Sequence, residues 1–151
     1  MDAHEYNVDI NWNQDRKGIM CSPELIRDGS VCIEVATPPE FPKGMPGIWS
    51  PEHLFTASVS SCLMTTFLAI AEYSRLEFKS FNCKSKGNLE QVEGGFQMTE
   101  IILEPTVTIV DEKDRERAER VLQKSEKACL ISNSIKSKVT MIPRIEMAEL
   151  V

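Results

Sequence analysis

The chain has 151 residues, a length that suits one domain, and its 42% hydrophobic and 26% charged residues are typical of globular proteins. The formal net charge is -6 and Lys and Arg form no cluster, which argues against a large phosphate-binding surface and so against a nucleic-acid partner. A domain of this size can bury roughly two thirds of the surface that its unfolded chain exposes, so it needs no disulfide to fold.

The first part of the chain is predicted to form strands. Residues 8–12 and 31–35 alternate between apolar and polar side chains, a period typical of half-buried strands. Another strand is expected near residues 19–22. Asp28-Gly29, between this strand and the next, favours a hairpin turn.

Residues 37–51 hold most of the prolines and two glycines, so no regular structure is expected there. The segment also carries four large apolar side chains: Phe41, Met45, Ile48 and Trp49. A long loop of this kind either packs onto the body of the protein or lines a pocket, and the sequence favours both equally.

A long helix is predicted from about Pro51 to Tyr73. Ser50 suits the N-cap, Pro51 suits the first helical position, and the Glu52 carboxylate favours the positive end of the helix dipole. Residues 54–71 carry no charge and approach the length of a membrane-spanning helix. Because several of them are Ser or Thr, we interpret the segment as a helix buried on all sides in a soluble protein, with no membrane partner.

Strands return over residues 78–110, where Gly94-Gly95 indicates a turn and Pro105 a bulge or an edge. Asp111 is expected to cap a second helix, and a last strand is expected over residues 138–147. The apolar stripe of the second helix has helical spacing and consists of Ala118, Val121, Leu122, Ser125 and Cys129.

This order of strands, helix, strands, helix and strand predicts an α+β fold in a single domain, residues 1–151, without repeats. The first residues are polar and lack the basic start and apolar run of a signal peptide. We therefore expect a cytoplasmic protein.

The five cysteines are Cys21, Cys32, Cys62, Cys83 and Cys129. They form no CxxC pair, and with only two histidines in the chain no zinc site of the usual spacing is visible. Taken alone, each is best interpreted as a small, inert, buried residue. A reactive Cys62 needs a positive partner from elsewhere in the fold, because burial alone raises the pKa of a thiol.

Two segments resemble the signatures of the osmotically inducible protein C / organic hydroperoxide resistance (OsmC/Ohr) family. Residues 50–55 and 60–63 resemble its Pro-Glu-x-Leu…Ala-Cys signature, with the same spacing between Glu52 and Cys62. Residues 126–134 resemble the second cysteine motif, which also follows an amphipathic helix and precedes a serine. The resemblance implies antiparallel sheets packed around two central helices, in an entwined homodimer with sites at the subunit interface.

The resemblance also implies a chemistry. Cys62 would be the peroxidatic thiolate, which attacks a hydroperoxide and becomes a sulfenic acid, and Cys129 would be the resolving thiol. An external dithiol, which is a lipoyl group in the hydroperoxide resistance branch, would reduce the resulting disulfide, with no bound cofactor or metal. Leu130 stands where the best-known members have a proline, so the chain resembles a less studied branch.

Arg16 matches the family's activating arginine, which lies in an Arg-x-Gly turn after the first strand. It would stabilise the Cys62 thiolate and polarise the peroxide, while Glu52 would hold it in a bidentate pair. The OsmC branch instead takes its arginine from the loop before the helix, where this chain has only Lys43 as a cation. The competing interpretation of Arg16 is a solvated turn residue.

The expected partners are a small hydroperoxide and a dithiol reductant. Phe41, Met45, Ile48 and Trp49 fit an organic hydroperoxide better than hydrogen peroxide, because an apolar pocket gains roughly 25 cal/mol for each Å² of apolar substrate that it buries. Cys21, Cys32 and Cys83 match no family motif and are expected to be structural.

Two other functions compete with the peroxidase. One is a redox-sensing or small-molecule-binding module with the same two cysteines and no turnover. The other is an acyl-transfer or hydrolytic enzyme, which needs a histidine base beside Cys62. His53 lies about 13 Å from Cys62 along one helix, which is too far, so we rank this function last.

Overall fold

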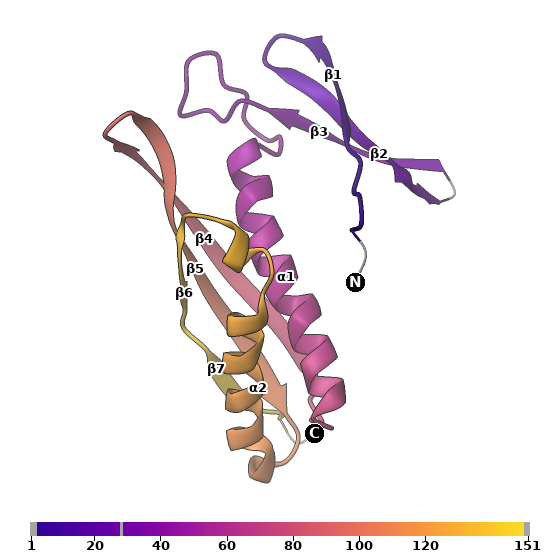
Figure 1. Cartoon of the computed structure of the whole chain (residues 1–151), viewed down its shortest axis with the longest axis vertical. Coiled ribbons are helices and arrows are strands. Elements are labelled where there is room, and N and C mark those ends of the chain that lie inside the picture. The colour runs from indigo at the N-terminus through magenta and orange to yellow at the C-terminus, as the bar shows by residue number, and fades with distance from the viewer. Residues whose placement is uncertain (1–2, 28, 150–151) are drawn as a thin grey trace. The chain divides into compact units, whose positions relative to one another are not determined.

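The computed structural model describes residues 3–27 and 29–149 (Figure 1). The chain forms two compact units, Met1–Leu54 and Phe55–Val151. The helix α1 (Pro51–Tyr73) begins in the first unit and continues through the second. The single domain expected from the sequence stays a prediction.

The first unit contains an antiparallel sheet of three strands in the order β1-β2-β3. These are β1 (Asp9–Gln14), β2 (Lys17–Arg27) and β3 (Gly29–Ala36), so the strands predicted here are confirmed. Asp15 turns the chain between β1 and β2 with a positive φ of 48°, and its carbonyl accepts a hydrogen bond of 3.0 Å from the Trp12 indole. The turn predicted at Asp28-Gly29 includes Asp28, which lies outside the described residues.

The two faces of this sheet differ in character. Because side chains alternate along a strand, the register places Ile10, Met20 and Ile33 side by side on one face, which we call the apolar face. Cys21, Cys32 and Glu34 lie on the opposite face.

The loop over residues 37–50 folds back on itself. The backbone N–H of Ala36 donates to the Trp49 carbonyl at 2.8 Å, and that of Met45 donates to the Thr37 carbonyl at 2.9 Å. A side chain at Gly44 would overlap the backbone of Pro38, so only glycine fits this close approach. The absence of helix from this loop is as predicted.

The helix α1 spans the range predicted from the sequence. The Ser50 hydroxyl caps it by accepting a hydrogen bond of 3.2 Å from the His53 backbone N–H. Several of its hydroxyl groups, including those of Ser58 and Ser60, bond to carbonyls three residues earlier, so they need no outside partner.

Only one face of α1 is buried within the chain. The buried residues recur at helical spacing and are Val59, Cys62, Leu63, Phe67 and Ala71. Met64 and Leu68, on the other side, are 40% and 43% exposed. The expectation of a helix buried on all sides is therefore wrong for a single chain, because one sheet covers only one face of an apolar helix. By length and composition alone α1 could also cross a membrane, a test that core helices of soluble proteins pass too.

The second unit contains a mixed sheet. Its long strands β4 (Ser80–Val92) and β5 (Gly95–Ile109) form an antiparallel pair, and the short strands β6 (Lys138–Met141) and β7 (Arg144–Met147) both pair parallel with β5. The α+β fold class is confirmed; β6 and β7 depart from the expected antiparallel pairing, since both run parallel to β5. Their parallel direction follows from the helical crossover between β5 and β6.

The last predicted strand is divided into β6 and β7 at Ile142 and Pro143. Pro105 in β5 lies opposite this break, since Leu103 is the last partner of β6 and Thr106 is the first partner of β7. Pro105, which has no backbone N–H, therefore lies where β5 lacks a neighbouring strand on that side. This agrees with the prediction that Pro105 marks a local edge.

The crossover consists of a 3-10 helix, η1 (Glu112–Asp114), followed by α2 (Arg115–Ala128). Asp111 caps η1 through a hydrogen bond of 3.0 Å from the Lys113 backbone N–H. The predicted apolar stripe of α2 is buried, and Cys129 is the first residue after the helix. A second 3-10 helix, η2 (Ser132–Ser134), leads to β6.

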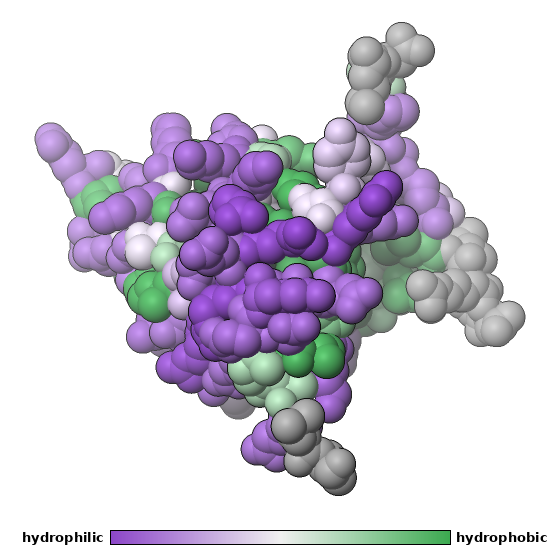
Figure 2. All heavy atoms as spheres, turned by 90° about the horizontal axis from the view of Figure 1, so that it is seen from below, coloured by the Kyte–Doolittle hydropathy of each residue, from purple (hydrophilic) through white to green (hydrophobic). Residues whose placement is uncertain are grey.

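The core of the second unit lies between the sheet and the two helices, which cover the same face of it in Figure 1. Alternate residues of β5 point inward and meet both helices; Val107 and Ile109, for example, pack with Phe67 of α1 and Leu122 of α2. Figure 2 shows hydrophilic side chains over most of the visible surface, with smaller apolar groups between them.

Candidate functional site

Cys62 and Cys129 lie against each other in the second unit. Cys62 is on the buried face of α1, and Cys129 is the residue at which α2 ends; they are 9% and 1% exposed. The two thiols are close enough for each to shift the pKa of the other. The packing of α1 and α2 on the same sheet face thus brings together the two cysteines that the resemblance to the OsmC/Ohr family singled out.

The surroundings of Cys62 favour its thiolate. Burial raises the pKa of Cys62, but the backbone N–H of Ile131, the Cys129 thiol, the Thr66 hydroxyl and the backbone N–H of Leu130 lower it, and the net pKa lies below the ordinary value of a thiol. The Thr66 hydroxyl is 3.9 Å from the Cys62 sulfur, one turn further along α1. Stabilisation by backbone N–H groups was missed in the sequence, because any residue except proline carries one.

The turn that presents these N–H groups is held by hydrogen bonds of its own. Cys129 leaves the helical conformation with φ −65° and ψ 108°, and its carbonyl accepts from the Asn133 backbone N–H at 3.1 Å. The Asn133 amide also donates to the Lys127 carbonyl, and the Ser134 hydroxyl donates to the Leu130 carbonyl. These bonds hold the turn that follows α2, and the backbone N–H groups of Leu130 and Ile131 in this turn lower the pKa of Cys62.

The pKa of Cys129 shifts in the opposite direction to that of Cys62. Burial raises its pKa; the hydroxyl and backbone N–H of Ser132 lower it, and the hydrogen bond and negative charge of Cys62 raise it further. The net pKa of Cys129 is above the ordinary value. Of the two thiols, Cys62 therefore ionises first, while Cys129 keeps its proton.

Arg16 belongs to the first unit, in the turn between β1 and β2. Its side chain is exposed, and with Asp15, Lys43 and Met45 it lines a pocket of about 480 Å³. Arg16 therefore shares a pocket with Lys43, which lies in the loop from which the OsmC branch takes its arginine. Its role as the activating arginine stays a prediction.

The other residues predicted for the site lie around the loop and the start of α1. Glu52 is half-buried in the first turn of α1, and its pairing with Arg16 stays a prediction. Ile48 and Trp49 line a second pocket of about 350 Å³, with Gly47 and His53. Phe41 and Met45 are half-buried.

His53 contributes to the cap of α1. Its Nδ1 lies 2.6 Å from the Ser50 hydroxyl and accepts a hydrogen bond of 3.3 Å from the Ser50 backbone N–H. The imidazole thus takes the place of the Glu or Gln of a capping box. Its ring also meets Trp49 edge-on, with the centroids 6.1 Å apart.

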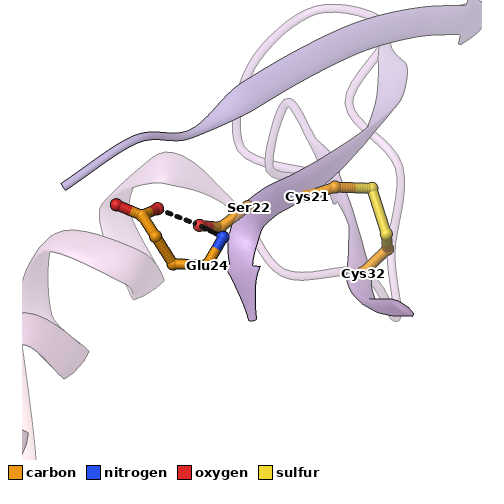
Figure 3. Close-up of a disulfide and its surroundings, with 4 residues drawn as sticks. All are labelled: Cys21, Ser22, Glu24 and Cys32. Carbon is orange, nitrogen blue, oxygen red and sulfur yellow. Dashed lines mark hydrogen bonds between the residues drawn. A yellow bond between two sulfur atoms is a disulfide. The ribbon is translucent and has the colours of Figure 1, made fainter. Parts of the chain in front are cut away.

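The remaining cysteines differ from one another. Cys21 and Cys32 form a disulfide between β2 and β3 (Figure 3), so their interpretation as separate buried residues is wrong. They face each other directly in the register of the two strands. Cys83 is a free, half-buried thiol on β4 whose pKa is raised by burial. Among residues 3–27 and 29–149 no cluster of His, Cys, Asp or Glu could hold a metal ion.

The chain is similar to known proteins over most of its length. The family model described as OsmC-like protein matches residues 44–143. The uncharacterized protein YmaD of Bacillus subtilis (strain 168) is 24% identical over 144 residues, which cover 93% of each chain.

Solved structures show the same fold. An OsmC-like protein of unknown function from Vibrio cholerae has a TM-score of 0.81 and 21% identity, over 93% of this chain and 99% of that one. An organic hydroperoxide resistance protein from Elizabethkingia anophelis has a TM-score of 0.74 and 19% identity, over 97% and 99% of the two chains.

Proposed function

Because the chain belongs to the OsmC-like protein family, we propose that it is a thiol-dependent peroxidase that reduces organic hydroperoxides, with hydrogen peroxide as the second substrate to be tested. The observation that carries the proposal is the contact between Cys62, whose pKa is lowered, and Cys129, whose pKa is raised. A nucleophilic thiolate beside a second, protonated thiol is the arrangement that a two-cysteine peroxidase requires.

The reaction has three steps. The Cys62 thiolate attacks the terminal oxygen of the hydroperoxide; the O–O bond breaks, the alkoxide takes up a proton and leaves as an alcohol, and Cys62 becomes a sulfenic acid. The Cys129 thiol then attacks the sulfenic sulfur, which releases water and forms the Cys62–Cys129 disulfide. An external dithiol, lipoyl-type or other, supplies the two electrons that restore both thiols.

The N–H groups of Leu130 and Ile131 stabilise the attacking thiolate in this scheme. Arg16 is the proposed further activating cation, held by Glu52. Met45 beside Arg16, together with Phe41, Ile48 and Trp49 of the same loop, provides apolar surface for an organic substrate. The name of the Elizabethkingia anophelis structure, an organic hydroperoxide resistance protein, supports this choice of substrate.

We further propose a cytoplasmic homodimer. The apolar face of the first sheet supports this, since Ile10 and Trp12 on it are 62% and 76% exposed in the single chain. The exposed Met64 and Leu68 of α1 provide a second surface that a partner subunit would cover. Light scattering of the purified protein at micromolar concentration tests the dimer, and a monomer mass would contradict it.

Turnover of peroxide tests the function. Consumption of tert-butyl hydroperoxide and of hydrogen peroxide is measured with dihydrolipoamide as the dithiol, for the wild type, Cys62→Ser and Cys129→Ser. We expect rapid loss of the organic peroxide with the wild type, none above background with Cys62→Ser, and slower turnover with Cys129→Ser. The control Cys83→Ser removes a thiol outside the pair and keeps the wild-type rate.

The same measurement distinguishes the peroxidase from the alternative function, a redox-sensing module without turnover. A redox-sensing module would consume one equivalent of peroxide and then stop although dithiol is present. Turnover that persists in Cys62→Ser would instead overturn the assignment of the nucleophile.

A further inference from the structure

The Cys21–Cys32 disulfide joins two directly opposed residues of β2 and β3 (Figure 3). Their Cα atoms are 4.5 Å apart, the spacing of a non-hydrogen-bonded pair in an antiparallel ladder. The strands themselves therefore hold the two sulfur atoms within bonding reach, whether or not the bond is closed.

The Cys21–Cys32 pair is partly exposed to solvent. Both cysteines are half-buried, in contrast to the fully buried Cys129. They share a polar face of the sheet with the ion pair between Lys17 and Glu34, whose charged atoms are 2.7 Å apart. A small thiol can approach the disulfide from this face.

The neighbouring carboxylate lies on the other side of the strand. Figure 3 shows Ser22 and Glu24 pointing away from the disulfide, with the Ser22 hydroxyl donating to the Glu24 carboxylate at 2.6 Å. Since successive side chains of a strand alternate, the Ser22 side chain is on the face opposite Cys21. Its hydrogen bond with Glu24 does not cover the sulfur atoms.

The hairpin does not depend on the bond. Backbone pairing continues from the two cysteines toward the start of β2, through Met20 with Ile33 and Ile19 with Glu34. Opening the disulfide leaves these ladder hydrogen bonds in place, so the sheet can remain folded in both redox states.

We propose that Cys21 and Cys32 form a second redox-active site, which exchanges electrons with small dithiols and disulfides while the protein stays folded and is independent of Cys62 and Cys129. Disulfides in cytoplasmic proteins are usually transient and take part in catalysis or redox sensing. The expectation of a transient disulfide rests on the cytoplasmic location that is part of the proposed function. The opposed positions of Cys21 and Cys32 are independent of that location.

Reduction of the Cys21–Cys32 disulfide by a dithiol takes two steps. A thiolate of the external dithiol attacks one sulfur atom of the Cys21–Cys32 bond; that bond breaks, a mixed disulfide forms, and the released cysteine takes up a proton. The second thiol of the dithiol then attacks the mixed disulfide, releases the other cysteine and leaves as a cyclic disulfide. Two electrons pass from the dithiol to the protein, and oxidised glutathione reverses the process by taking two electrons and leaving as two glutathione thiols.

The test uses the full chain with Cys62→Ser, Cys83→Ser and Cys129→Ser, so that Cys21 and Cys32 are its only thiols. The protein is treated with dithiothreitol under native conditions, freed of it, and then treated with oxidised glutathione. Samples are alkylated with N-ethylmaleimide at each stage and mapped by mass spectrometry, and circular dichroism follows the fold. Because both proposed peroxidase cysteines are absent, the result is independent of the proposed function.

We expect both thiols to be alkylated after reduction and neither after reoxidation, with an unchanged circular dichroism spectrum. A bond that opens only after unfolding in guanidinium chloride, or thiols that do not close again, would overturn the proposal.

A second variant set guards against misfolding of the first. With Cys32→Ser in the wild-type background, Cys21 should form a mixed disulfide with glutathione. This reaction should be about tenfold or more faster than that of Cys83, which is half-buried with a raised pKa. Equal or slower modification of Cys21 would contradict the accessibility on which the proposal depends.

Discussion

Cys129 lowers the pKa of Cys62, and Cys62 raises the pKa of Cys129, across the contact between α1 and the turn that ends α2. The two residues are far apart in the chain, and the common sheet face that supports both helices brings them together. Because the pKa of Cys62 is lowered and that of Cys129 is raised, the pair divides into one nucleophile and one proton donor.

The first prediction concerns the pH dependence of thiol reactivity. Only the thiolate is alkylated, so a lowered pKa moves the alkylation curve of Cys62 to lower pH and a raised pKa moves that of Cys129 to higher pH. Cys83, with its raised pKa, is an internal reference. Iodoacetamide labelling followed by mass spectrometry should give Cys62 the lowest midpoint of the three, and a midpoint of Cys62 at or above that of Cys83 would contradict the account.

The second prediction concerns the backbone donors. Leu130→Pro removes one of the N–H groups that lower the pKa of Cys62, and the extended conformation of Cys129, with ψ 108°, is one that a residue before proline can adopt. Loss of a typical hydrogen bond costs about 0.5–1.5 kcal/mol.

We therefore expect alkylation of Cys62 at neutral pH to slow by roughly three- to tenfold in Leu130→Pro. Leu130→Ala is the matched control, because it removes the side chain and keeps the N–H. Equal rates in the two variants would show that the N–H of residue 130 has no part in stabilising the thiolate.

The third prediction concerns the start of α1. Ser50→Ala removes the hydroxyl that caps the helix and should lower the free energy of unfolding by about 1 kcal/mol. Ser61→Ala is the control, since its exposed hydroxyl bonds only to the Ser58 carbonyl of its own helix. Urea denaturation compares the two, and a loss in Ser61→Ala as large as in Ser50→Ala would be inconsistent with the cap.

The fourth prediction concerns the contact between α1 and β4. A Cβ atom at Gly87 would overlap the Thr56 hydroxyl and lie 2.7 Å from the Met98 methyl group, so Gly87→Ala should destabilise the second unit by about 1–3 kcal/mol. Lys86→Ala, one position along the strand and on its other face, should change stability by less than about 0.5 kcal/mol. Urea denaturation midpoints of the two variants test this prediction. An unchanged midpoint for Gly87→Ala would mean that α1 can move away from β4 without cost.

Local signals in the sequence predicted the local structure well. The start of α1 follows from its capping residues and the buried stripe of α2 follows from helical spacing, both of which act within a few residues. The parallel pairing of β6 with β5 could not be predicted in this way, because the choice of a strand partner is made by the packing of the whole unit.

The disulfide was missed for a related reason. The register of β2 and β3 shifts between Cys21 and Ile26. Without that shift, the pairing of Ile26 with Ser30 would continue to Cys21 opposite Val35, and not opposite Cys32. Pro23 lies in this segment and is typical of an irregular strand, but it does not give the size of the shift.

The candidate site was found only in part. The resemblance to the OsmC/Ohr family singled out Cys62 and Cys129, whereas the spacing of residues alone favoured inert cysteines. The N–H groups of Leu130 and Ile131 have no signature in the sequence, because they depend on how the backbone turns after Cys129. The roles of Arg16 and Glu52 stay predictions.

Mapping of disulfides after a single turnover tests the central claim most directly. The reduced protein is mixed with one equivalent of tert-butyl hydroperoxide, without dithiol, quenched with acid and analysed by peptide mass spectrometry. The account predicts a Cys62–Cys129 disulfide in the wild type and, in Cys129→Ser with dimedone present, a dimedone adduct on Cys62. Unmodified Cys62 thiol in both proteins, with the peroxide left unconsumed, would contradict the account.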